Sequence, residues 1–182
     1  MNCYGGKELA ASFRTVRKNT LVIANEIPEE KYSFKAAPDV RSVGELLTHI
    51  AVSYGFQYQL HATERRKNME GFDFPSLMQR MIAEEKQPRS KAQIIELLET
   101  TRDKWAGWVE GLSDEFLAEK VEMPARANAP ARTRFDMILS VKEHEMHHRG
   151  QLMLIERIIG IVPHLTREGQ ARMAAALTAQ KS

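Results

Sequence analysis

The sequence predicts an all-α protein, a four-helix bundle with a short additional helix at its C-terminal end. Apolar residues recur at three- and four-residue steps along four long segments, which is the spacing of one face of an α-helix. Alternating runs of β-branched and polar residues, which mark strands, are nearly absent. Residues 1–182 are expected to form a single domain, because a chain of this length commonly folds around one core.

The first two helices are predicted from their apolar stripes and their end signals. The first runs from about Lys7 to Glu26, and Pro28 ends it. The second begins at Ser42, whose hydroxyl can accept from a first-turn amide while Glu45 reaches back to the serine, as in a capping box. This second helix is expected to end before Gly71.

The third helix begins at Ser90, where Gln93 completes another capping box, and continues to Gly111. The linkers on either side of it leave room for a crossover, so the order of the helices around the bundle is not set by the sequence. A short helix at Asp114–Lys120 and a loop rich in proline and alanine at Met123–Arg132 follow.

The fourth helix is predicted from about Arg134 to Ile159, and Gly160 and Pro163 terminate it. Thr166 is placed to cap a last short helix toward Leu177. The fourth helix has an apolar stripe that should face the bundle interior. The stripe contains Ile138, Val141, His148, Leu152, Ile155 and Ile159, with His144 at its edge.

Composition excludes several classes of function. The formal net charge is only +2 and the basic residues are spread along the chain, which is not the footprint of a nucleic-acid-binding protein. Cys3 is the only cysteine, so neither an intrachain disulfide nor a cysteine-based zinc site can form. The chain shows no apolar signal-peptide core and no apolar run of about 18 residues that could span a membrane. A soluble, cytoplasmic protein is expected.

Two histidines on the fourth helix are candidate metal ligands. His144 and His148 are four residues apart and therefore project side by side from one helix face. Such a pair also occurs on exposed faces without a metal, but this one lies on or beside the apolar stripe, where an imidazole needs a partner for its nitrogens. A shared metal ion would satisfy both rings. His147 is less well placed for the same ion.

His49 is the best candidate for a third ligand. It lies among apolar residues of the second helix, and a neighbouring helix could bring it to the histidine pair. Taken alone, it would more often be a hydrogen-bonded core histidine than a ligand. His61 and His164 are expected at the surface, because charged residues or a loop surround them. Glu45 is a weaker candidate to accept from a ligand imidazole, since capping already explains it.

Residues 144–148 also match H-E-x-x-H, the zinc signature of many metallopeptidases. In that reading Glu145 is the general base and a third ligand lies downstream. The extended form fails, because Gln151 stands where a glycine is needed and Leu154 where the third histidine is needed. Glu168 could imitate a downstream ligand, but no sheet precedes the helix to line a peptide cleft. A peptidase is therefore disfavoured.

Two separated blocks of the chain resemble the DinB/YfiT-like family of metal-binding helical bundles. The first is IPEEK at residues 27–31 followed by RSVGELLTHI at residues 41–50, and the second is HEMHHRGQ at residues 144–151. The resemblance extends over most of the chain in order and spacing. It implies a four-helix bundle with crossover connections, commonly a homodimer. It also implies a divalent metal on three histidines, which by motif are His49, His144 and His148.

What the resemblance implies about activity is less specific. Members of the family are similar to thiol S-transferases that use bacillithiol or mycothiol, to a mycothiol-dependent isomerase and to proteins described as metal-dependent hydrolases. The leading hypothesis is a metal-dependent thiol S-transferase that acts on a small molecule, in which the metal holds the thiolate of a low-molecular-weight thiol and lowers its pKa. Hydrolysis would use water at the same position.

The competing hypothesis is a noncatalytic metal-binding bundle, for example a stress-response protein. A purely structural site would be closed by a fourth protein ligand, for which His147 and Glu145 are the candidates. Zinc or nickel is expected first, and iron and manganese also accept imidazole. No catalytic residue is identified. The residues expected to line the pocket are Tyr54, Gln57, Glu145 and Gln151.

Overall fold

The structure, a computed structural model, describes residues 4–125, 127 and 130–180. Four helical columns form the bundle: α1 (Gly6–Glu26), α2 (Val43–Val52) with its continuation, α5 (Lys91–Glu110) and α7 (Arg134–Ile158). The all-α prediction is therefore confirmed. The expectation about Cys3 concerns a residue outside the described part of the chain. Among the described residues, no helix is both long enough and apolar enough to cross a membrane.

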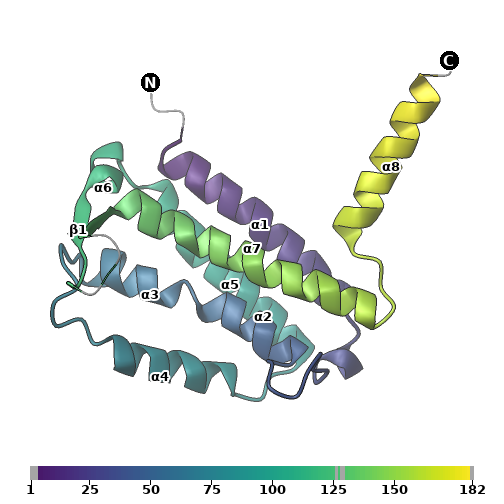
Figure 1. Cartoon of the computed structure of the whole chain (residues 1–182), viewed down its shortest axis with the longest axis horizontal. Coiled ribbons are helices and arrows are strands. Elements are labelled where there is room, and N and C mark those ends of the chain that lie inside the picture. Colours follow the sequence, from purple (N-terminus) through teal and green to yellow (C-terminus); the bar gives the residue numbers. More distant parts are fainter. Residues whose placement is uncertain (1–3, 126, 128–129, 181–182) are drawn as a thin grey trace.

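The helices are arranged with crossovers. Both α1 and α2 pack against α5 and α7, so α1 and α2 lie diagonally opposite each other in the bundle, as do α5 and α7. The connections from α1 to α2 and from α5 to α7 therefore join diagonal partners. Helices α1 and α7 run in the same direction, and α8 (His164–Ala179) projects away from the bundle (Figure 1). The predicted crossover topology is confirmed.

The second predicted helix is not continuous, and an additional helix follows it. After α2 the column continues through α3 (Gly55–Tyr58) and a π-helical turn at Gln59–Thr63. It ends there, before Gly71, as predicted. The linker then forms α4 (Phe74–Glu85), which the sequence analysis missed and which packs against α2. An aspartate begins α4 in the usual way, because the side chain of Asp73 accepts from the amide of Ser76.

The remaining elements differ slightly from the prediction. Both capping boxes are present, at Ser42 and at Ser90. The short helix α6 is Asp114–Ala118. The segment before the predicted loop, β1 (Lys120–Glu122), pairs as an antiparallel strand with β2 (Ala131–Thr133), which begins at the end of that loop. Residues 126, 128 and 129 of that loop lie outside the described part.

The N-terminal end of α8 was predicted wrongly. The helix begins at His164 with Pro163 at its N-cap, so Thr166 lies inside it and does not cap it. Proline has no backbone N–H group, and a residue before the first helical turn has no N–H hydrogen bond to make within the helix, so proline is well suited to this position.

A buried ion pair joins α1 to α7 in the middle of the bundle. Arg17 and Glu145 are each 1% exposed, and the Nε atom of Arg17 donates to both carboxylate oxygens, at 2.9 and 3.0 Å. Thr20 also donates to Glu145, at 2.7 Å. The remaining donors of Arg17 reach α5 at the carbonyl oxygen of Leu98, 2.7 Å away, and α2 at that of Ile50, 3.3 Å away. The guanidinium of this α1 residue therefore contacts the other three helical columns.

His61 and His164 are buried, so the prediction that they lie at the surface was wrong. His61 is 0% exposed: its Nδ1 atom accepts from Nη1 of Arg134 at 2.8 Å, and its Nε2 atom lies 3.0 Å from the side-chain oxygen of Gln57. Burial, helped by the charge of Arg134, lowers the pKa of His61 to about 3. His164 is 4% exposed at the start of α8.

We expect Arg17→Met to destabilise the protein by about 3–5 kcal/mol, because it leaves the Glu145 carboxylate buried without its charged partner. The double variant Arg17→Met with Glu145→Leu should recover much of that loss, since no buried charge remains. Urea unfolding of the two single variants and the double variant measures the coupling. Additive losses in the double variant would contradict a strong buried pair.

We expect His61 to make stability depend on pH. Its pKa is about 3 in the folded protein and about 6.5 in an unfolded chain, so the unfolded state binds the additional proton between these values. The free energy of unfolding should therefore fall as the pH drops from about 6.5 toward 3, by at most ~1.4 kcal/mol per pH unit from this group.

The matched variant for this prediction is His61→Asn, whose side-chain oxygen can still accept from Arg134 but does not titrate. Urea unfolding of both proteins in the presence of a chelator, at pH values from 4 to 8, should give a shallower pH dependence for the variant. The two proteins share every other titrating group. If the free energy of unfolding depends on pH with the same slope in both, His61 is not the group that binds the additional proton in the unfolded state.

Candidate metal centre

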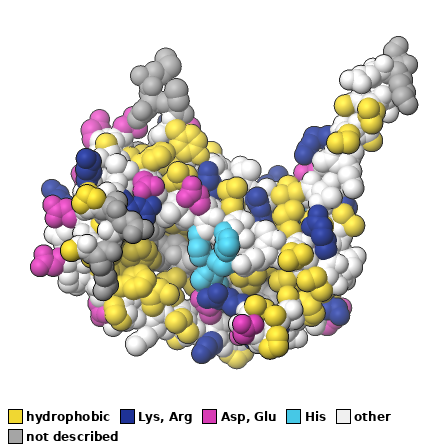
Figure 2. All heavy atoms as spheres, in the orientation of Figure 1, with side chains coloured by type: hydrophobic (Ala, Val, Ile, Leu, Met, Phe, Trp, Pro, Cys, Tyr) yellow, Lys and Arg dark blue, Asp and Glu magenta, His cyan; other side chains and the backbone are white. Residues whose placement is uncertain are grey.

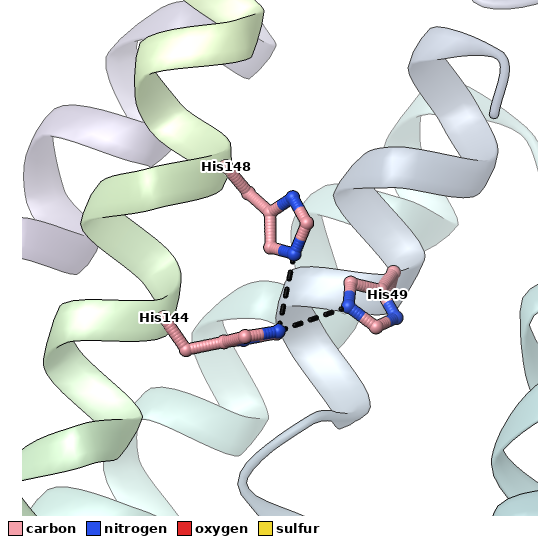
Figure 3. Close-up of side chains that lie close together, drawn as sticks. All are labelled: His49, His144 and His148. Carbon is pink, nitrogen blue, oxygen red and sulfur yellow. Dashed lines mark hydrogen bonds between the residues drawn. The ribbon is translucent and has the colours of Figure 1, made fainter. Parts of the chain in front are cut away.

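Three histidine side chains from two helices converge at one point (Figure 3). His49 comes from α2, and His144 and His148 come from successive turns of α7. The Nε2 atom of His144 lies 3.2 Å from that of His49 and 3.1 Å from that of His148. Three imidazole nitrogens that each lie ~2.0–2.1 Å from a tetrahedral ion are separated by roughly 3.3 Å. The spacing therefore fits one metal ion.

The hydrogen bonds of the outer ring nitrogens support this fit. The Nδ1 atom of His148 lies 2.8 Å from the side-chain oxygen of Gln151, an acceptor, so Nδ1 carries the proton. The Nδ1 atom of His49 lies 2.6 Å from a carboxylate oxygen of Glu85 and is protonated for the same reason. A neutral imidazole protonated at Nδ1 presents a lone pair at Nε2. The lone pairs of His49 and His148 therefore point at the place where a cation would bind.

Burial keeps these imidazoles in the state that binds metal. It is the main cause that lowers the pKa of His144 to about 4, with further lowering by the neighbouring histidines. Burial also lowers the pKa of His49 and of His148, against the opposing effect of Glu85 on the first and of Gln151 on the second. All three rings are neutral near pH 7, and neutral imidazole is the form that ligates metals.

Glu85 at the end of α4 contacts the candidate site, and the sequence analysis did not predict this. One of its oxygens accepts from His49, and the other accepts from Nε of Arg41 at 2.7 Å. A carboxylate behind a ligand imidazole fixes the ring and raises its basicity. The capping residue Glu45, which sequence had suggested for this role, is bonded instead to its own capping serine and to Lys35.

Several predicted site residues lie elsewhere. The carboxylate of Glu145 points into the bundle toward Arg17, so the predictions that it lines the pocket or serves as a fourth ligand were wrong. Tyr54 packs against Trp105 and Tyr58, and Gln57 bonds to His61, so neither lines the cavity beside the histidines.

Gln151 does lie at the histidines, where it links His148 and His147. Besides its contact with His148, its side-chain nitrogen lies 3.3 Å from Nε2 of His147. His147 is exposed and is not among the three histidines whose ligand atoms converge. Among the described residues, no other histidine, cysteine or carboxylate joins that group, so the candidate donor set is three imidazoles.

A cavity of about 630 Å³ opens beside His148, the one member of the three converging histidines that lines it. Figure 2 shows the histidines at the surface in a hollow of this face, next to basic, acidic and apolar side chains. The size is typical of a small-molecule site. The lining comes from the segment before α2 and from α2, α4 and α7, and comprises Lys35, Ala36, Asp39, Val40, Arg41, Glu45, Leu46, Ile82, Glu85, Lys86, His148, Gln151, Leu154 and Ile155.

The chain forms a four-helix bundle with crossover connections, and three histidines from two of its helices converge beside a cavity. These features place it in the class of helical bundles that carry a candidate metal centre. Residues 12–152 match the family model of the DinB superfamily. The chain therefore belongs to the DinB superfamily, and all three histidines lie within the matched residues.

Two proteins of Bacillus subtilis are similar to this chain. The uncharacterized protein YjoA is 26% identical over 153 residues, covering 84% of this chain and 90% of YjoA. The crystal structure of YjoA, described as DinB-like, gives a TM-score of 0.61 at 24% identity over 84% of this chain and 92% of that one. YfiT gives a TM-score of 0.66 at 13% identity over 88% of this chain and 91% of that one.

YfiT is described as a probable metal-dependent hydrolase with an unusual four-helix bundle topology. At these identities the structural likenesses establish the fold, which agrees with the crossover arrangement of α1, α2, α5 and α7. They leave the reaction of this chain to be argued from its own residues.

We expect Glu85→Gln to weaken metal binding by about 10–100-fold, because the amide still accepts from His49 but no longer raises its basicity. Competition with a chromophoric zinc chelator measures the dissociation constant. Glu84→Gln is the matched control, since Glu84 is adjacent on α4 but pairs with Arg89. Equal affinities for Glu85→Gln and the unmodified protein would rule out this role for Glu85.

Proposed function

We propose that the protein is a metal-dependent enzyme of the thiol S-transferase type that acts on a small molecule. His49, His144 and His148 would hold one divalent ion, with zinc or nickel favoured and iron or manganese also compatible. The single observation that carries the proposal is the three-imidazole donor set beside a cavity of about 630 Å³. Three protein ligands with a position left for an external ligand are typical of catalytic sites.

Each group around the centre has a defined task in this proposal. Three neutral imidazoles leave the full charge of the ion in place, and a thiol or a water molecule bound to such an ion loses its proton near neutral pH. Glu85 fixes the ring of His49, and Gln151 fixes the ring of His148. Both rings are thereby held so that their Nε2 atoms face the place where the three histidines would hold an ion.

Hydrolysis is the second candidate, and the description of YfiT as a probable metal-dependent hydrolase favours it. The two reactions differ in the nucleophile that the ion would activate at the position not taken by a histidine. This nucleophile would be a thiolate in transfer and hydroxide in hydrolysis. A noncatalytic bundle is less well supported, because the two residues considered as a fourth ligand, Glu145 and His147, lie outside the converging group.

A cytoplasmic homodimer stays a prediction. The exposed apolar side chains of Ile158 on α7, and of Met173 and Leu177 on α8, are the surface that such an interface would bury.

We expect the purified protein to bind one equivalent of divalent metal and His49→Ala or His144→Ala to reduce the bound metal to a small fraction, since two imidazoles no longer complete the donor set. Elemental analysis after dialysis measures the stoichiometry. His147→Ala is the matched control, because this residue is adjacent on α7 but exposed. Full metal occupancy in His49→Ala would show that the ligand set is wrong.

The reaction itself is tested on the metal-loaded protein. Conjugation of several low-molecular-weight thiols to a chloronitroaromatic compound should exceed the uncatalysed rate and should disappear in His144→Ala. Hydrolysis of an activated ester in the same preparations tests the second candidate. Activity that survives removal of the metal by a chelator would contradict both.

A further inference from the structure

We infer that the cavity beside the histidines binds a small molecule with an apolar body and one anionic group, which Arg41 and Lys86 hold. As a statement about the substrate this inference rests on the proposed function, while as a statement about binding it stands on the cavity alone. Its basis is a lining that combines apolar side chains, two acidic side chains paired with residues of the protein and basic side chains that retain free donors.

The apolar part of the lining includes three exposed aliphatic side chains. Val40, Ile82 and Leu154 are 40%, 42% and 59% exposed, and all three surround the same cavity. Leu46 and Ile155 form buried parts of the wall. A ligand that covers these aliphatic groups gains roughly 25 cal/mol for each Å² of apolar surface removed from water. The cavity is therefore suited to an aliphatic or aromatic body.

Two acidic residues of the lining are already committed to partners within the protein. Both oxygens of Glu85 are used, one by His49 and the other by Arg41. Glu45 accepts from the amide of Ser42 at 2.7 Å and lies 3.4 Å from Nζ of Lys35. Glu85 therefore cannot bind a cationic ligand without losing a bond to His49 or Arg41, and the charge of Glu45 is already offset by Lys35.

The basic residues have donors to spare. Arg41 uses only Nε, for Glu85, and is 41% exposed, so the N–H groups of its two terminal nitrogens remain for a ligand. Lys86 is exposed and makes no ion pair with a described residue. Asp39, also exposed, offsets one charge but offers only acceptors. Paired N–H groups of a guanidinium fit the oxygens of a carboxylate or a phosphate.

The position of Arg41 links this anion site to the histidines. Arg41 bonds to Glu85, Glu85 bonds to His49, and His148 itself belongs to the cavity lining. An anionic group held at Arg41 is therefore connected to the imidazole of His49 through one intervening side chain, that of Glu85. The same ligand can present another of its groups to the candidate metal centre while Leu154 and Ile155 cover its apolar part.

Calorimetric titration of metal-free protein tests this inference, because the metal cannot then attract the anion. The probes are octanoate, octyl phosphate, octanamide and propanoate at pH 8. We expect at least one of the two octyl anions to bind about tenfold or more tightly than octanamide, which lacks the charge, and than propanoate, which lacks the apolar body. The anion that binds more tightly identifies the head group as carboxylate or phosphate.

Charge-removing variants locate the anion site. Lys86→Gln and Arg41→Gln should each weaken binding of the preferred anion several-fold, and Lys120→Gln, at the β1 end of the molecule, should leave it unchanged. Lys86 is exposed, so its variant should fold even if Arg41→Gln does not. Equal binding of octanamide and both octyl anions, or unchanged binding in Lys86→Gln and a folded Arg41→Gln, would overturn the inference.

The two proposals can fail separately in this design. A protein that binds no metal can still prefer an octyl anion, and a protein that binds one equivalent of metal on its histidines can show no such preference. The titration therefore addresses the cavity, and the elemental analysis addresses the histidines.

Discussion

The guanidinium of Arg17 is the constraint on which the candidate site depends. It lies in the centre of the bundle, donates to Glu145 on α7 and reaches the carbonyl oxygen of Ile50 on α2. These two partners directly follow His144 and His49 in the chain. The contacts that neutralise and solvate a buried cation therefore also set the separation of the two helices that carry the histidines. Such a pair adds little net stability but penalises any arrangement that separates its partners.

The sequence predicts the histidine cluster because its geometry is largely local. The i, i+4 spacing places His144 and His148 together on any α-helix, and the apolar neighbours of His49 indicate that it faces inward. In the folded protein His49 and His148 are buried and His144 is half-buried, which agrees with both arguments. The role of Glu85 is not local, since it lies 36 residues from His49 on a helix that covers α2 from outside. No periodicity within either segment indicates that pairing.

The incorrect predictions for His61 and Glu145 have the same physical origin. His61 is followed by charged residues, which predicts exposure, but it lies in the π-helical turn at Gln59–Thr63. An inserted residue in such a turn changes which side chains face the core, and here Arg134 receives the buried ring. The partner of Glu145 lies 128 residues away at Arg17. Propensity and spacing describe single helices, whereas these contacts depend on how the helices cross.

The burial of Glu145 also bears on the chemistry that the site can perform. In a metallopeptidase the glutamate of H-E-x-x-H accepts the proton of the attacking water, but here both oxygens are bound by Arg17, and Thr20 adds a further bond. Glu85, the carboxylate in contact with a candidate ligand, is engaged by His49 and Arg41. A reaction at this centre is therefore best served by a nucleophile that loses its proton on binding the ion itself. A thiol does so more readily than water, which is the physical reason to place thiol transfer ahead of hydrolysis.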